Sequence, residues 1–191
     1  FYANLSKKTN KMNKKIINQK FLYKKLIVLV GHMGCGKSTI GKILAKNLNL
    51  KFYDSDRIIE NSQKKSIKRI FEEKGENYFR KIKKKILRKL LHKNDAVIAI
   101  GGGAILEKET RDLIYKKTIS IFLNVDIEVL VERLKKNNKR PLLKNVDIKE
   151  KILSLDNKRS KFYKKADIEI QNINNIDQSI KRLKELIFYY S

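Results

Sequence analysis

The sequence predicts an α/β protein, a three-layer α/β/α sandwich around a mostly parallel sheet of about five strands. Two features predict this class. Short, continuous apolar runs such as Leu26–Val30 are typical of strands that are buried on both faces of a parallel sheet. Amphipathic stretches of helical length separate these runs, and alternation of strands and helices produces a parallel sheet covered by helices.

The expected strands cover residues 26–30, 96–100 and 119–123, with shorter candidates at 51–53 and 168–170. The expected helices cover residues 37–48, 66–92 with a break near Gly75, 108–115, 127–136, 148–163 and 176–189.

The 191 residues suffice for one domain with a continuous core. We expect residues 26–191 to form this single domain. Residues 1–25 are expected to be a basic, disordered tail in which Met12 is a candidate initiator. A transit peptide is the competing interpretation of the tail, but the segment is short and rich in Lys rather than Arg.

The formal net charge of +26 taken alone would favour a nucleic-acid or membrane partner. The lysines, however, are spread over nearly every segment and are not interleaved with aromatic residues, so we expect no specific nucleic-acid partner. No apolar run approaches the roughly 18 residues of a membrane span. Cys35 is the single cysteine, which excludes an internal disulfide. These features favour a soluble, cytoplasmic protein.

A glycine-rich loop follows the first expected strand and opens the first expected helix. Its sequence, Gly31-His32-Met33-Gly34-Cys35-Gly36-Lys37-Ser38, matches the pattern G-x-x-x-x-G-K-[ST] of a phosphate-binding P-loop. Such loops direct backbone N–H groups and the positive end of a helix dipole at phosphates. We therefore expect ATP to be bound by Gly34, Cys35, Gly36, Lys37, Ser38 and Thr39.

Within this loop, Lys37 would supply a charge to the β and γ phosphates, and the Ser38 hydroxyl would be a ligand of Mg²⁺. The side chains of His32 and Cys35 lack the further ligands of a zinc site. Phosphoryl transfer to a substrate hydroxyl requires no protein nucleophile, so both side chains are predicted to take no part in the chemistry.

A pair of carboxylates follows the second expected strand, at Asp54-Ser55-Asp56. In an extended segment, residues two apart point to the same side, so one carboxylate would face a metal ion and the other the substrate. The alternative is that Asp56 caps a helix that begins at Arg57. Either way, the pair lies where open α/β sheets bind ligands, beyond the carboxyl ends of the strands.

Together with later motifs, these segments resemble the shikimate kinase family over about residues 26–170. The later motifs are Phe71-Glu72-Glu73-Lys74-Gly75-Glu76-Asn77-Tyr78-Phe79-Arg80, Gly101-Gly102-Gly103-Ala104, Arg140-Pro141-Leu142-Leu143, and Arg159 with Tyr163 and Ala166-Asp167. The resemblance implies a P-loop kinase fold and a monomer that uses ATP and Mg²⁺ to convert shikimate into shikimate 3-phosphate.

The resemblance also implies roles for individual residues. Asp54 would help to hold Mg²⁺ through water, and Asp56 would bind the ring hydroxyls and accept the proton of the attacking one. Arg80 and Arg159 would clamp the carboxylate, and Gly102 would present its backbone N–H to the substrate. Arg140, in a mobile lid at residues 137–147, would close over the ATP phosphates, so the catalytic residues would be Lys37, Asp56 and Arg140. The family usually has a proline two residues after the arginine corresponding to Arg159, whereas this chain has Lys161.

Two other functions remain open at this point. A gluconate or nucleoside monophosphate kinase would share the P-loop, and its substrate phosphate would also be met by arginines. A basic nucleic-acid-binding protein with an incidental P-loop would instead show steep, salt-dependent binding to arbitrary DNA or RNA that survives the Lys37→Met substitution.

Overall fold

The computed structural model describes residues 25–136, 147–171 and 176–188, and it confirms the predicted fold class. Five strands form one sheet in the order β2-β3-β1-β4-β5, and all four pairings are parallel. The strands are β1 (Leu26–Val30), β2 (Lys51–Asp54), β3 (Ala96–Ala99), β4 (Ile119–Asn124) and β5 (Ile168–Gln171). They agree with the expected segments to within one residue at each end.

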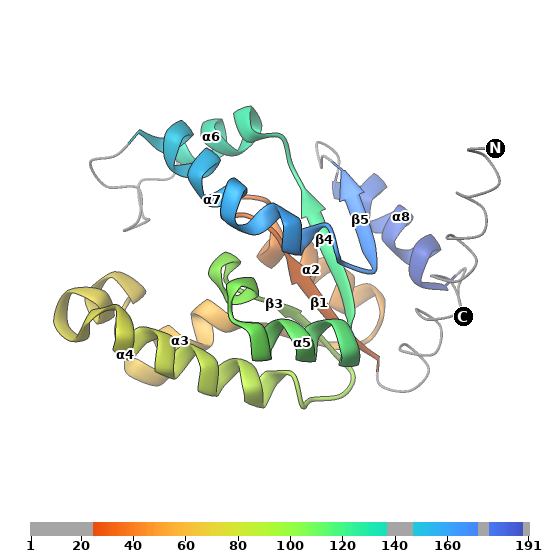
Figure 1. Cartoon of the computed structure of the whole chain (residues 1–191). Helices are drawn as coiled ribbons and strands as arrows, with labels where there is room; N and C mark the ends of the chain where they lie inside the picture. The colour runs from red at the N-terminus through yellow and green to blue at the C-terminus, as the bar shows by residue number, and fades with distance from the viewer. Residues whose placement is uncertain (1–24, 137–146, 172–175, 189–191) are drawn as a thin grey trace.

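The helices of the described residues alternate with the strands along the chain (Figure 1). They are α2 (Lys37–Asn47), α3 (Ser55–Gln63), α4 (Ile67–Leu90), α5 (Lys108–Lys117), α6 (Ile127–Lys135), α7 (Ile148–Tyr163) and α8 (Ile176–Phe188), with a short 3₁₀ helix, η1 (Gly102–Leu106), after β3. The expected break near Gly75 is present, because Gly75 has a φ of 74° and interrupts the helical geometry of α4.

The sheet separates two apolar clusters, as a strand buried on both faces requires. Alternate residues of β1 point to opposite faces, so Ile27 and Leu29 join one cluster while Leu26 and Val28 join the other. The first cluster also contains residues of α2 and α8, and the second contains residues of α4 and α5. This arrangement makes the three layers of the sandwich.

The parallel strands place their following loops at one edge of the sheet. Figure 1 shows α3 and α4 on one side of this edge and α6 and α7 on the other. The order of the strands reverses direction around β1, since β3 lies on one side of it and β4 on the other. Ligands of open α/β sheets bind at such a reversal, and here the reversal brings together the loops after β1 and β3.

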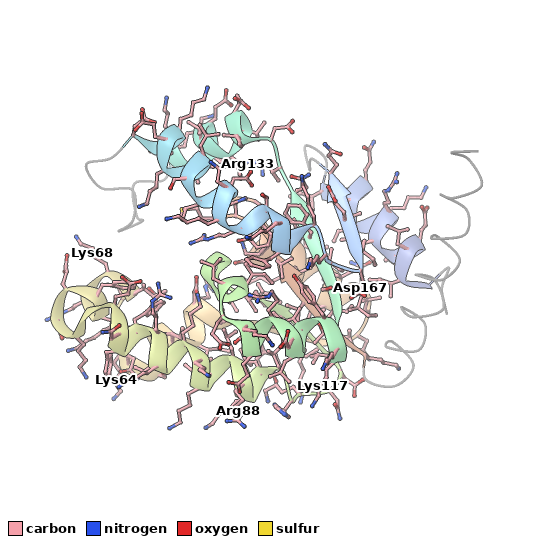
Figure 2. The ribbon with its side chains drawn as sticks, viewed as in Figure 1. Lys64, Lys68, Arg88, Lys117, Arg133 and Asp167 are labelled. Atoms are coloured by element: carbon pink, nitrogen blue, oxygen red, sulfur yellow. The ribbon has the colours of Figure 1, made fainter. Side chains whose placement is uncertain are left out.

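The segment Ala166-Asp167, one of the resembling motifs, has a structural role. The backbone N–H and the hydroxyl of Ser120 on β4 donate hydrogen bonds of 2.9 and 2.7 Å to Asp167 Oδ2, and the Asp167 N–H donates one of 3.0 Å to Ser120 Oγ. Figure 2 shows Asp167 beside these strands. These bonds fix the start of β5 against β4.

Most charged side chains lie on the outside of the layers. Figure 2 shows Lys68, Arg88 and Lys117 extending outward from α4 and α5, and all three are exposed. None of the described helices combines the length and the apolar character that crossing a membrane requires.

Candidate active site

The glycine-rich loop joins β1 to α2 in the conformation that its glycines permit. Gly31, Gly34 and Gly36 have φ values of 139°, 80° and 93°, which side-chain-bearing residues rarely adopt. Gly36 is the N-cap of α2 and leaves the first turn without a side-chain cap. No side chain therefore caps the N–H groups at the start of α2, which leaves them available to an anion bound in the loop.

Lys37 lies over this loop rather than in the core. Its Nζ donates hydrogen bonds to the carbonyl oxygens of Gly31 at 2.9 Å and His32 at 2.6 Å, and it lies 3.5 Å from Cys35 Sγ. Phosphate oxygens would compete with these neutral acceptors and form stronger, charge-assisted hydrogen bonds. The Cys35 side chain is buried beneath the loop, so only its backbone is available to a nucleotide.

Asp54 and Asp56 do not share an extended segment, so the prediction that a period of two aligns them was wrong. Asp54 is the last residue of β2 and the N-cap of α3, and its Oδ1 accepts from the N–H groups of Asp56 and Arg57 at 3.1 and 3.3 Å. The proposal that Asp56 caps a helix beginning at Arg57 was also wrong, since the helix begins at Ser55. Capping by Asp54 turns the chain one residue after the strand ends.

The second oxygen of Asp54 faces the P-loop. Ser38 Oγ donates a hydrogen bond of 2.6 Å to Asp54 Oδ2. A hydroxyl and a carboxylate oxygen side by side fit Mg²⁺, which prefers oxygen ligands and takes the remaining ones from phosphates and water. The described residues contain no group of three or more His, Cys, Asp or Glu that could hold a metal ion.

Asp56, in the first turn of α3, lies against the loop after β3. A Cβ atom on Gly101 would lie 2.4 Å from Asp56 Oδ1, so a side chain there would clash with the carboxylate. The Gly101 N–H donates a hydrogen bond of 3.1 Å to Ser55 Oγ. The loop after β3 and the start of α3 are thereby held together.

Gly102 is the point where the two halves of the candidate site meet. A Cβ atom on it would lie 3.1 Å from the Gly31 carbonyl oxygen, 3.1 Å from Tyr163 Oη and 3.2 Å from Arg159 Nη1. Tyr163 also donates a hydrogen bond of 2.7 Å to the Gly102 carbonyl oxygen. The missing side chain thus allows the P-loop, η1 and α7 to approach one another.

Arg159 is buried, at 8% exposed, although it lies on a helix with many exposed cations. It shares one face of α7 with Asp156 and Tyr163, which are three residues before it and four after it. Its Nε has no hydrogen-bond partner among the described residues. Arg159 therefore lies on the buried face of α7, next to Gly102 and Gly103. Lys161, at the position where the resembling family has a proline, does not change this register.

His32 joins the P-loop to the same face of α7. Its Nε2 lies 2.9 Å from Asp156 Oδ1, and its ring meets the Tyr163 ring edge-on with centroids 5.1 Å apart. Burial lowers the pKa of His32 below its ordinary 6.5, although the hydrogen bond to Asp156 opposes this effect. The neutral imidazole then donates from Nε2 to the carboxylate. This link was not found from the sequence.

The remaining predicted site residues are Arg80, which the structure does not bring into the group around Gly102, and Arg140. The Arg80 side chain is 64% exposed, and its Nε and Nη2 donate to Glu76 Oε1 one turn earlier in α4. Arg80 would have to exchange Glu76 for a substrate carboxylate. Arg140 and nearly all of the predicted lid, residues 137–146, lie outside the described residues.

Lys83 is a charged residue of the site that sequence reasoning missed. Its Nζ would lie 3.6 Å from a Cβ atom on Gly103, and Arg159 Nη2 would lie 3.5 Å from the same atom. The available signal was its position three residues after Arg80, which places both on one side of α4. Because Lys81, Lys84 and Lys85 on the same helix are also cations, this spacing did not distinguish Lys83 from them.

Comparison with known proteins identifies relatives along most of the chain. The family model described as "Shikimate kinase" matches residues 33–187. A shikimate kinase of Zymomonas mobilis is 42% identical over 148 residues, which are 78% of this chain and 84% of the relative. One of Aquifex aeolicus is 37% identical over 157 residues, 82% of this chain and 92% of the relative.

Solved structures resemble the fold as a whole. A shikimate kinase from Acinetobacter baumannii, determined in complex with shikimate, superposes with a TM-score of 0.83 at 31% identity, over 90% of this chain and 97% of that chain. The Aquifex aeolicus enzyme superposes with a TM-score of 0.75 at 36% identity, over 85% of this chain and 96% of that chain.

Proposed function

The chain belongs to the shikimate kinase family and phosphorylates shikimate with ATP, and we propose that the residues around Gly102 carry out this reaction. The observation that carries the proposal is the meeting at Gly102 of the P-loop carbonyl of Gly31 with Tyr163 and Arg159, all within 3.2 Å of one point. A phosphate donor on the loop and an acidic acceptor beside Arg159 would then be neighbours.

The donor half consists of the P-loop. Backbone N–H groups of Gly34, Cys35, Gly36, Ser38 and Thr39 would bind the ATP phosphates, with Lys37 across the β and γ phosphates. Ser38 and Asp54 would hold Mg²⁺, which when bound offsets negative charge on those phosphates. Two oxygen donors within 2.6 Å of each other support this assignment.

The acceptor half would hold shikimate by its opposite ends. Asp56 would accept hydrogen bonds from ring hydroxyls, and Arg80 and Arg159 would bind the carboxylate through their planar guanidinium groups. The Gly102 N–H would contribute one more donor. The burial of Arg159 supports the arrangement, because a desolvated guanidinium binds a carboxylate more strongly than an exposed one.

Transfer would then proceed by positioning and electrostatics. The substrate hydroxyl oxygen forms a bond to the γ phosphorus while the bond from that phosphorus to the ADP oxygen breaks, and the hydroxyl proton passes to an oxygen of Asp56. Lys37 would stabilise charge on the transferring group. We propose that Arg140 does the same from a lid at residues 137–147, which would also exclude water as a competing acceptor.

We further propose that the protein acts as a cytoplasmic monomer without a nucleic-acid or membrane partner, with residues 26–191 as its single domain. The monomer is consistent with a proposed site that takes Lys37, Asp56 and Arg159 from a single copy of the chain. Light scattering coupled to gel filtration tests the monomer, and a dimeric mass would contradict it.

The decisive experiment is an ADP-release assay across shikimate, gluconate and the nucleoside monophosphates, with Lys37→Met as the inactive control. We expect release that depends on shikimate and on Mg²⁺. Release that depends on gluconate or a nucleoside monophosphate would assign another acceptor to the same fold.

A further inference from the structure

Two cations from different helices converge on the backbone of η1. Lys83 Nζ, from α4, and Arg159 Nη2, from α7, would lie 3.6 and 3.5 Å from a single Cβ atom placed on Gly103. Among the described residues, the side chains of these two cations supply the nearest atoms that such a Cβ would meet, at ordinary van der Waals contact. The position adjoins Gly102, where the P-loop and α7 meet.

Lys83 differs from its neighbours on α4 in its surroundings. Lys84, the next residue, is exposed and pairs with Glu109 at 2.7 Å and Glu107 at 3.6 Å. Lys83 is half-buried, and no carboxylate of the described residues lies within ion-pair distance of its Nζ. Its aromatic neighbour is Phe79, whose ring centroid lies 5.8 Å from Nζ.

The charges that face Lys83 come from every side of the candidate site. The pKa of Lys83 is lowered to about 8, chiefly by burial and also by the positive charges of Arg159, Arg80 and Lys37, while the carboxylate of Asp56 acts in the opposite direction. Three cations against one carboxylate leave a surplus of positive charge. A bound carboxylate at this point would offset part of that surplus.

We propose that Lys83 is a third cation of the substrate-binding site, and that it binds the shikimate carboxylate together with Arg80 and Arg159. This inference rests on the proposed function, and it adds a residue to the acceptor half of the site. Arg80 precedes Lys83 by three residues on α4, and Arg159 shares the Gly103 position with it, so the charges of both arginines act on Lys83.

If Lys83 binds the carboxylate as an ammonium ion, the binding of shikimate should depend on pH. Free Lys83, with a pKa of about 8, is mostly protonated at pH 7 and mostly neutral at pH 9. A bound carboxylate favours the ammonium form and raises the pKa, so binding is strongest below about pH 8 and weakens as the pH rises above it. The KM for shikimate should therefore rise above about pH 8, while the KM for ATP should follow a different profile.

The test measures kcat and both KM values between about pH 6.5 and about pH 9.5 for the wild type, Lys83→Met, Lys83→Arg and Lys84→Met. We expect Lys83→Met to raise the KM for shikimate roughly tenfold or more at pH 7 and to abolish its rise above pH 8. Lys83→Arg should keep a low KM at every pH, because a guanidinium stays protonated. Lys84→Met, at an exposed residue, is the matched control and should resemble the wild type.

Circular dichroism and melting temperature establish that each variant is folded. A Lys83→Met protein whose KM for shikimate stays within about twofold of the wild type at every pH would overturn the proposal. So would a fall in kcat alone, since Lys83 would then act through Asp56 rather than on the carboxylate. If the wild type itself released no ADP in response to shikimate, the proposed function would fail; if only the Lys83→Met result failed, this role alone would be refuted.

Discussion

Replacing Arg159 by Met tests the acceptor half of the site most directly. Met keeps an unbranched apolar chain in the volume of the arginine and removes only the guanidinium. Because Arg159 is 8% exposed, water could not readily replace the hydrogen bonds that we propose it makes to the substrate carboxylate. Loss of a hydrogen bond to a charged group costs about 1.5 to 3 kcal/mol. At about 1.4 kcal/mol for each factor of ten, kcat/KM for shikimate should fall roughly tenfold to over a hundredfold.

The effect on stability should be much smaller, which separates a binding role from a structural one. Arg159 Nε is buried without a hydrogen-bond partner among the described residues, so removing the guanidinium relieves one unsatisfied buried donor, although it also removes the hydrogen bond between Arg159 and Tyr163. A buried charge carries a desolvation penalty, and an apolar side chain of similar size does not. We therefore expect a melting temperature at or above that of the wild type.

The assay is steady-state ADP release with shikimate and ATP varied separately. Lys161→Met is the matched control, because Lys161 is exposed two residues along the same helix. Unchanged kcat/KM for shikimate in Arg159→Met, or a loss in Lys161→Met instead, would refute the assignment of the carboxylate site to the buried face of α7. An equal loss with ATP would show that Arg159 serves the donor half.

Three further substitutions test other parts of the site. Lys37→Met should abolish turnover with an unchanged circular dichroism spectrum, because among the described residues its Nζ bonds to loop carbonyls and Cys35 and to no core residue; near-normal turnover would contradict the P-loop assignment. Asp54→Asn keeps an oxygen that can cap α3 but removes the charge, so the Mg²⁺ concentration for half-maximal turnover should rise while the melting temperature hardly changes; an unaltered Mg²⁺ requirement would remove Asp54 from the metal site. Burial lowers the pKa of His32 below 6.5 in the folded state, so the unfolded chain binds the proton more readily and stability should decline as the pH falls below about 6.5. His32→Gln, which can still donate to Asp156, should reduce this decline. If the melting temperatures of the wild type and of His32→Gln fell equally between about pH 7 and about pH 5, the prediction would be contradicted.

The layers of the fold were predictable because their signals are local. Leu26–Val30 is an uninterrupted apolar run and forms a strand buried throughout. Ser66 and Asp147 cap α4 and α7 through their side chains, at the boundaries that the sequence indicates. Gly75 breaks α4 where it was expected to do so. Runs, caps and glycines act over a few residues, so one sequence is enough to recognise them.

The segment Asp54-Ser55-Asp56 shows where local reasoning fails. An extended chain and a capped helix both accommodate this sequence, and they direct the two carboxylates differently. The choice depends on where β2 ends, which its parallel pairing with β3 up to Asp54 decides. Asp54 then caps α3, and Asp56 turns toward Gly101. The motif was found from the sequence, but its geometry was not.

Lys83 shows the same limit for charge. The chain carries 46 lysines and arginines, and Lys81, Lys84 and Lys85 surround Lys83 in the sequence. Its distinction arises only when η1 and α7 pack beside α4 and bring Arg159 to the same glycine. No spacing within α4 contains that information.

The surface cations and the site cations should accordingly affect the enzyme in different ways. Exposed charges more than about 8 Å apart are largely screened at physiological salt, so the outer lysines of a chain with a net charge of +26 can attract anionic substrates only over short range. Arg159 is buried and Lys83 half-buried, so the interaction that we propose between them and a bound carboxylate would be screened much less. Raising the salt concentration should therefore slow substrate association, whereas the loss caused by Arg159→Met should persist at high salt, because it comes from a desolvated contact. If high salt removed the difference between wild type and Arg159→Met, Arg159 would belong with the surface charges rather than with the site.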